Sequence, residues 1–163
     1  MLAFDKIVNQ ELIAAGVRYT DLNELYRKSD VISLHVPLTD STRHMVDADA
    51  LSKMKAGVTL INTGRGALID AKALIASLKS GHLGAAGLDV YEEEENIFFR
   101  DLSDQVLQDD VLARLLTFPN VVITSHQAFL TNEALANIAD TTLQNISDFE
   151  NGKALVNEVR APG

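Results

Sequence analysis

The sequence of 163 residues predicts an α/β protein with a parallel, doubly wound sheet. Short apolar runs alternate with stretches of helical character, which is the pattern of strands joined by crossover helices. The runs are almost continuously hydrophobic, as in strands that are buried on both faces of a sheet. Hydrophobic residues make up 47% of the chain, which is enough apolar material for one core.

The expected strands are short apolar runs bounded by polar or turn-forming residues. Their shortness and their polar or turn-forming boundaries favour strands. The expected strands are MLAFD at 1–5, VISLHV at 31–36, VTLINT at 58–63, AAGLDV at 85–90 and VVITS at 121–125.

Capping residues mark the expected helices between these runs. Asp21 can cap a helix that has Glu24 three residues later, an acidic variant of the capping box. Asp70 can begin a second helix that Gly81 ends. The expected helices are DLNELYRK at 21–28, DADALSKM at 47–54, DAKALIASLKSG at 70–81 and a longer helix from about 131 to 152.

Charge and composition exclude several classes of function. The formal net charge of -9 repels nucleic acid and anionic lipid surfaces alike. The chain has no cysteine, so disulfides, cysteine-ligated zinc and a thiol nucleophile are excluded. No apolar run reaches the roughly 18 residues that span a bilayer. We therefore expect a cytoplasmic protein that binds neither nucleic acid nor membranes.

Residues that follow the expected strands are the candidates for ligand binding. In open parallel sheets, ligands bind beyond the carboxyl ends of the strands, and these ends lie along one rim. The residues expected along this rim are Asp5, Val36, Pro37, Thr63, Gly64, Arg65, Asp89 and His126.

Two charged residues of the rim have side chains that suit a cofactor or a substrate. Asp5 can accept both hydroxyl groups of an adenosine ribose, and its charge disfavours a 2′-phosphate. A helix cap or a solvated strand end is the alternative for Asp5. Arg65 lies between Gly64 and Gly66, which leave its planar guanidinium accessible to a substrate carboxylate. A surface arginine in a strand-to-helix turn is the alternative for Arg65.

His126 follows the last expected strand and is the candidate for acid–base chemistry. The glutamates at 92–95 offer an acidic partner, because a nearby carboxylate favours the protonated imidazole. The commoner explanations are a core or loop histidine and a solvated acidic loop. The connection 91–119 is long, which is typical of functional or disordered segments. No spacing predicts a metal site, and structural or exposed positions are expected for the other histidines, His35, His44 and His82.

Five strings occur in the order typical of one enzyme family. LAFD, DVISLHVPLT, LINTGRGALID, GLDVYEEEE and NVVITSHQAF together resemble the D-isomer-specific 2-hydroxyacid dehydrogenases over nearly the whole chain. NIFFRDLSDQVLQDD and the run His-Gln-Ala-Phe resemble the D-lactate dehydrogenase branch of that family. The resemblance implies a Rossmann-type domain and an NAD-dependent enzyme that interconverts a 2-oxo acid, pyruvate, and a D-2-hydroxy acid, D-lactate.

The resemblance also implies a role for each matching residue. Arg65 would bind the substrate carboxylate and polarise its carbonyl, His126 would be the acid–base residue, and Glu94 would hold His126. Phe129 would contact the substrate side chain. The residues implied in NAD binding are Asp5, Val36, Pro37, Thr63, Gly64, Arg65 and Asp89.

The sequence departs from the family pattern in one respect. It contains no Gly-x-Gly-x-x-Gly turn, the loop that holds the dinucleotide pyrophosphate. We therefore expect residues 1–130 to form most of a Rossmann-type domain, truncated at its amino-terminal end and without the first strand and that loop. Residues 131–163 are expected to form a carboxy-terminal helix and tail that return to a substrate-binding domain.

Three functional hypotheses remain open from the sequence. The chain is part of an enzyme that is active when complete or complemented, a non-catalytic remnant that only associates with a partner, or an NAD-sensing corepressor similar to a dehydrogenase. The segment after residue 91 disfavours the corepressor. The expected partners are a small 2-oxo or 2-hydroxy acid and either a second copy of the chain or an amino-terminal segment.

Overall fold

The structure is a computed structural model that describes residues 1–94, 97–98, 104 and 107–160. The chain divides into two compact units, Met1–His126 and Gln127–Gly163. The first unit contains two parallel sheets, and the second contains one long helix. The chain is therefore an α/β protein, as its sequence predicts.

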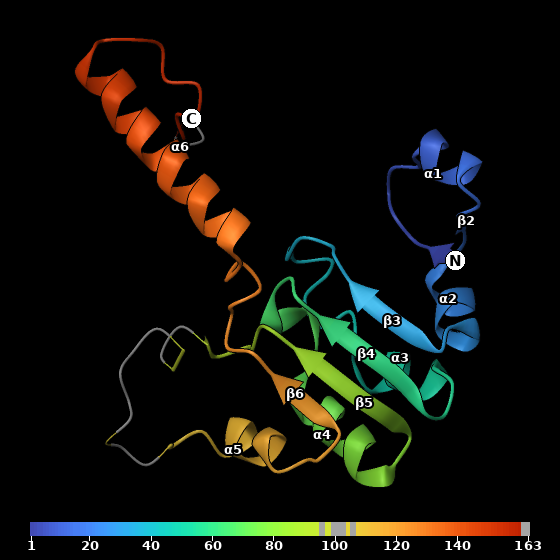
Figure 1. The fold of residues 1–163 in the computed structure, drawn as a ribbon. Coiled ribbons are helices and arrows are strands. Elements are labelled where there is room, and N and C mark those ends of the chain that lie inside the picture. Colours follow the sequence, from blue (N-terminus) through green and yellow to red (C-terminus); the bar gives the residue numbers. More distant parts are fainter. Residues whose placement is uncertain (95–96, 99–103, 105–106, 161–163) are drawn as a thin grey trace. The chain divides into compact units, whose positions relative to one another are not determined.

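The larger sheet of the first unit is parallel throughout (Figure 1). Its strands pair in the order β3-β4-β5-β6, so each crossover adds a strand on the same side. The register pairs Leu34 with Asn62, Asn62 with Leu88 and Leu88 with Ile123, so the carboxyl ends of all these strands lie level. The strands are β3 (Val31–Leu34), β4 (Val58–Asn62), β5 (Leu83–Leu88) and β6 (Val121–Ile123).

Helices that contact one another in series cover this sheet. The contacts run from α2 to α3, from α3 to α4 and from α4 to α5. Caps at both ends set the length of α4: Asp70 accepts from the backbone at its start, and Gly81 adopts the left-handed φ of 75° at its end. The helices are α2 (Leu22–Lys28), α3 (Ala48–Lys53), α4 (Ala71–Ser80) and α5 (Asp110–Leu116).

The capping box expected at α2 forms only in part. Asp21 accepts a hydrogen bond of 2.8 Å from the backbone N–H of Glu24, as predicted. The carboxylate of Glu24 instead pairs with Arg18 at 2.8 Å and with Lys28 at 2.7 Å. These hydrogen bonds, the one from Arg18 first, hold the pKa of Glu24 well below its ordinary value.

The core lies where the helices pack on the sheet. Leu60 of β4 and Leu68 have no exposed surface, and Leu115 of α5 is 1% exposed. Strand β3 alternates, because Leu34 is buried whereas Val31 is 63% exposed. The prediction that every strand is buried on both faces is therefore wrong for β3, since the helices that contact it cover one face. The core residues of the sheet are Ile32, Leu34, Val58, Leu60, Leu83, Ala86 and Leu88.

The strand expected at 1–5 does not join this sheet. Residues Leu2–Ala3 form β1, which pairs in parallel with β2 (Arg18–Tyr19) in a separate two-stranded sheet. The short helix α1 (Gln10–Ala14) connects them. In the part of the chain that the structure describes, no strand pairs with the outer edge of β3, so nothing joins the two sheets. Strand β1 therefore lies outside the larger sheet, and the placement of Asp5 on the rim of the later strands stays a prediction.

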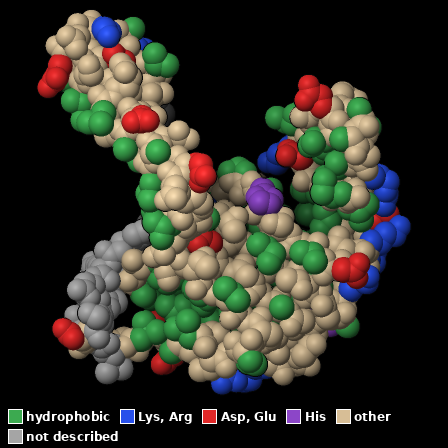
Figure 2. All heavy atoms as spheres, viewed as in Figure 1, with side chains coloured by type: hydrophobic (Ala, Val, Ile, Leu, Met, Phe, Trp, Pro, Cys, Tyr) green, Lys and Arg blue, Asp and Glu red, His purple; other side chains and the backbone are tan. Residues whose placement is uncertain are grey.

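The second unit consists of α6 (Asn132–Glu150) and a short tail. Thr131 caps the helix by accepting from Ala134 N at 3.1 Å, which agrees with the helix start expected at about residue 131. Apolar side chains reach the surface along this unit (Figure 2), and they include Leu135, Ile138, Leu143, Ile146 and Phe149. Across the described residues, none of the helices combines the length and the apolar character needed to cross a bilayer.

Candidate active site

The level carboxyl ends of β3 to β6 place several predicted residues at one edge. Val36 and Pro37 follow β3, Thr63 follows β4, and Asp89 follows β5. Val36 is half-buried, whereas Pro37 and Thr63 are exposed. Asp5 follows β1 of the two-stranded sheet and is exposed, and its carboxylate accepts from Ile7 N at 2.9 Å.

Asn62 shapes the turn that carries Arg65. Its side chain is 1% exposed, and its amide donates to Arg65 O at 2.9 Å while accepting from Gly64 N at 3.1 Å. Arg65 itself is exposed and donates from Nη1 to Gly64 O at 2.7 Å. Among the described residues it forms no salt bridge, so its charge is available to an anion.

Gly66 brings this turn into contact with the segment after β5. A Cβ on Gly66 would lie 2.0 Å from Tyr91 C and 2.4 Å from Glu92 N, so no other residue permits this approach. The contact leaves a cavity of about 160 Å³ whose lining includes Leu38, Arg65 and Glu94. A cation and a carboxylate that are 29 positions apart in sequence therefore border one space.

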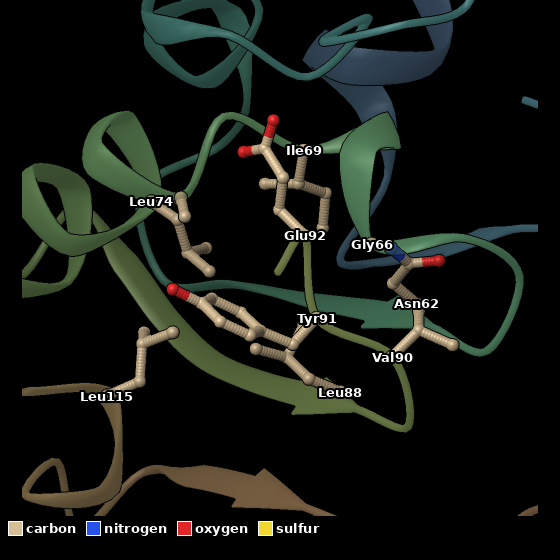
Figure 3. Close-up of a pocket in the computed structure, with 10 residues that line it drawn as sticks. Asn62, Gly66, Ile69, Leu74, Leu88, Val90, Tyr91, Glu92 and Leu115 are labelled. Atoms are coloured by element: carbon tan, nitrogen blue, oxygen red, sulfur yellow. The ribbon is translucent and has the colours of Figure 1, made fainter. Parts of the chain in front are cut away.

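Tyr91 anchors the beginning of this segment in the core. Its hydroxyl donates to the carboxylate of Asp109, with Oδ1 and Oδ2 at 3.0 and 2.9 Å, and Asp109 also caps α5. Burial, and then the hydrogen bond to Asp109, raise the pKa of Tyr91 well above its ordinary value. Figure 3 shows its ring extending toward Leu74 and Leu115, beside a cavity of about 10 Å³. That cavity has room for about one water molecule and for no substrate.

The structure brings His126 and Glu94 together. His126 Nδ1 lies 2.9 Å from Glu94 Oε1, and the second carboxylate oxygen of Glu94 accepts from Tyr91 N at 2.9 Å. The Glu94 side chain is 12% exposed and that of His126 is 33% exposed, so the ion pair is shielded but reachable. A carboxylate at Nδ1 fixes the ring orientation and favours the neutral tautomer with hydrogen on Nδ1.

Asp89 and the backbone hold His126 in an uncommon conformation. Ser125 and His126 have φ angles of 54° and 58°, in the left-handed region that non-glycine residues seldom adopt. His126 N donates to Asp89 O at 2.5 Å, and the hydroxyl of Thr124 donates to the carboxylate of Asp89. Asp89 is 4% exposed. Backbone strain of this kind is typical of functional sites.

Sequence reasoning missed several residues that shape this site. Asn62 carried a signal, since it is a polar residue that ends a buried strand before a glycine. Arg43, His44 and Glu92 form an ion-paired cluster that no local pattern indicates. Phe129 belongs to the second unit, so its contact with a substrate stays a prediction.

Comparison with known proteins gives consistent matches. The family model described as "D-isomer specific 2-hydroxyacid dehydrogenase, NAD binding domain" matches residues 1–128. The D-lactate dehydrogenase of Escherichia coli K12 is 50% identical over 159 residues, which cover 98% of this chain and 48% of that protein.

Solved structures agree with that match. The pyruvate reductase of Chlamydomonas reinhardtii is 44% identical with a TM-score of 0.90, covering 96% of this chain and 48% of its own. A D-lactate dehydrogenase from Aquifex aeolicus, complexed with NAD and lactic acid, is 38% identical with a TM-score of 0.83. The match covers 93% of this chain and 46% of that chain. The chain therefore spans slightly less than half the length of these relatives.

Proposed function

The chain belongs to the D-isomer-specific 2-hydroxyacid dehydrogenase family, and we propose that it supplies the catalytic residues for NAD-dependent interconversion of pyruvate and D-lactate. The observation that carries this proposal is the His126–Glu94 pair, which lies at the strand edge that also presents the turn of Arg65. The names of the matched relatives support pyruvate and D-lactate as the substrate pair.

His126 is the proposed acid–base residue. Glu94 occupies its Nδ1 side, so proton transfer uses Nε2, which donates a proton to the carbonyl oxygen of the 2-oxo acid during reduction. In oxidation the neutral ring accepts that proton from the hydroxyl group. The carboxylate of Glu94 keeps the ring in one orientation and accepts the hydrogen on Nδ1, which leaves Nε2 to face the substrate.

Arg65 is the proposed binding site for the substrate carboxylate. Its exposed guanidinium offers parallel N–H donors that match the two oxygens of a carboxylate. The same positive charge stabilises the carbonyl oxygen as negative charge develops there. Phe129 is the proposed contact for the substrate methyl group.

The residues at the strand edge fit a dinucleotide. Val36 and Pro37 offer an apolar wall after β3, Thr63 offers an exposed hydroxyl after β4, and Gly64 follows it in the turn. NAD, when bound, supplies or accepts the hydride. We propose that these residues and Asp89 line the adenine and nicotinamide positions, and that Asp5 binds the adenosine ribose.

The chain would reach full activity with further polypeptide. We propose that residues 1–130 are most of an NAD-binding domain, that residues 131–163 return to a substrate-binding domain, and that an amino-terminal segment completes the fold. The outer edge of β3, unpaired among the described strands, supports this, because an open strand edge favours pairing with another segment. Homodimerisation is the alternative form of association.

A hybrid enzyme tests the proposal. The amino-terminal half of the Escherichia coli relative, joined to this chain, should consume NADH with pyruvate and produce D-lactate. Arg65→Gln in the hybrid should lower kcat/KM by about 100-fold or more, because a transition-state donor is lost, with a much smaller change in NADH affinity. Full activity of the Arg65→Gln hybrid would contradict the assigned role. A folded hybrid that binds NADH without turnover would favour a non-catalytic remnant or a sensor.

A further inference from the structure

Glu92 accepts hydrogen bonds from two side chains of a distant loop. Its Oε1 lies 2.7 Å from His44 Nε2 and 3.0 Å from Arg43 Nη2. The Glu92 side chain is 17% exposed, which sets it apart from a solvated member of an acidic run. Exposed ion pairs contribute little to stability, but a shielded carboxylate with two donors holds its segment in place.

The loop that carries His44 is itself fixed to the turn of Arg65. His44 N donates to Ala67 O at 2.8 Å, and Val46 N donates to Leu68 O at 3.0 Å. His44 has a φ of 51°, so its backbone lies in the left-handed region. A non-glycine residue keeps such a conformation only where the surrounding contacts enforce it.

Glu92 connects this loop to the segment that carries Glu94. Its backbone N–H lies against Gly66, and its carboxylate reaches across to His44. Glu94 follows two residues later and meets His126. Ion pairing at Glu92 therefore sets the distance between the turn of Arg65 and the carboxylate that orients His126.

We infer that Glu92 is a positioning residue: its ion pairs with His44 and Arg43 hold Glu94 in register with His126 and with Arg65. The inference rests on the proposed function only for the catalytic roles of Glu94, His126 and Arg65. Glu92 acts through Glu94 and takes no part in proton transfer. Glu93, its exposed neighbour, forms no salt bridge among the described residues and serves as the matched control.

The tautomer of His126 shows whether Glu94 still faces its Nδ1, and the measurement requires no enzyme activity. In the chain labelled with ¹⁵N-histidine at about pH 9, where ordinary imidazoles are neutral, His126 should carry its hydrogen on Nδ1, facing Glu94. Glu92→Ala should change this into a mixture of both tautomers. Glu92→Gln keeps an oxygen acceptor for His44 and should retain most of the Nδ1–H form. Glu93→Ala should leave the spectrum unchanged.

A second pair of variants tests the same contact from the other side. His44→Gln and His44→Leu share the cost of the left-handed backbone, but only glutamine keeps a donor for Glu92. His44→Leu should reproduce the tautomer mixture of Glu92→Ala, and His44→Gln should not. This pair decides the question if Glu92→Ala does not fold. A single Nδ1–H tautomer in both His44→Leu and Glu92→Ala would overturn the inference.

Kinetics of the hybrid enzyme separate positioning from general destabilisation. Glu92→Ala should lower kcat by about 10- to 100-fold with a smaller change in the KM for pyruvate, because a misplaced acid–base pair slows the chemical step. Asp49→Asn, which removes an exposed ion pair with Lys53, should leave kcat unchanged. An inactive wild-type hybrid would contradict the proposed function, whereas the tautomer measurement still decides the role of Glu92.

Discussion

Gly66→Ala is the substitution for which the structure gives the clearest magnitude. The added Cβ would lie 2.0 Å from Tyr91 C and 2.2 Å from Tyr91 O, about 1.4 Å short of the 3.4 Å at which ordinary contact begins. Both neighbours are backbone atoms, so no side chain can rotate away. The cost should reach the upper end of overpacking, about 3 kcal/mol. With a urea m-value of about 2 kcal/mol/M, the unfolding midpoint should fall by about 1.5 M.

The control for this prediction lies in the same turn. A Cβ on Gly64 would meet Leu68, Asn62 and Leu34 at 3.5 to 3.7 Å, which is ordinary contact. Gly64→Ala should therefore move the urea midpoint by no more than about 0.4 M in either direction. Both chains are measured by circular dichroism during urea titration. A Gly66→Ala midpoint within about 0.3 M of the parent would refute the close approach of this turn to Tyr91.

Further predictions concern the polar groups of the site. Asn62→Leu should destabilise the chain by about 2 to 3 kcal/mol, because it leaves the Gly64 N–H and the Arg65 carbonyl without their buried partner, and urea unfolding measures this loss. The raised pKa of Tyr91 makes ionisation cheaper in the unfolded chain, so stability is complete below about pH 10 and falls as pH rises toward the higher folded-state pKa. Tyr91→Phe should flatten that alkaline decline in part, since burial also raises the pKa of Tyr26, and urea midpoints between about pH 8 and pH 11 test this. An equally steep decline in Tyr91→Phe would assign the effect to other groups.

The central strands could be predicted because their signal is local. Apolar runs at 31–36, 58–63, 85–90 and 121–125 correspond to β3 to β6, with ends shifted by one or two residues. The caps at α2, α3 and α4 could be predicted as well, because the capping side chain and its backbone partner lie within three residues of each other.

Features that depend on distant partners could not be predicted in the same way. The run at 1–5 has the composition of a sheet strand, but only Leu2–Ala3 forms one, because pairing depends on which segments are present beside it. Helix α5 lies inside the long connection 91–119, for which no helix was predicted, and Asp109 caps it and also binds Tyr91. The ion pair of His44 and Glu92 joins positions 48 apart, so no local sequence pattern could have predicted it.

The acidic run after β5 poses an electrostatic question for a site that is proposed to bind an anion. Carboxylates beside Arg65 would repel a 2-oxo acid if they stayed unpaired. The structure pairs two of them internally, since Glu92 meets His44 and Arg43, and Glu94 meets His126. Arg65 forms no salt bridge among the described residues, so its charge is the one left for the substrate. A chain with a net charge of -9 can thus keep a local positive site, because the two shielded carboxylates nearest to it, those of Glu92 and Glu94, already have partners.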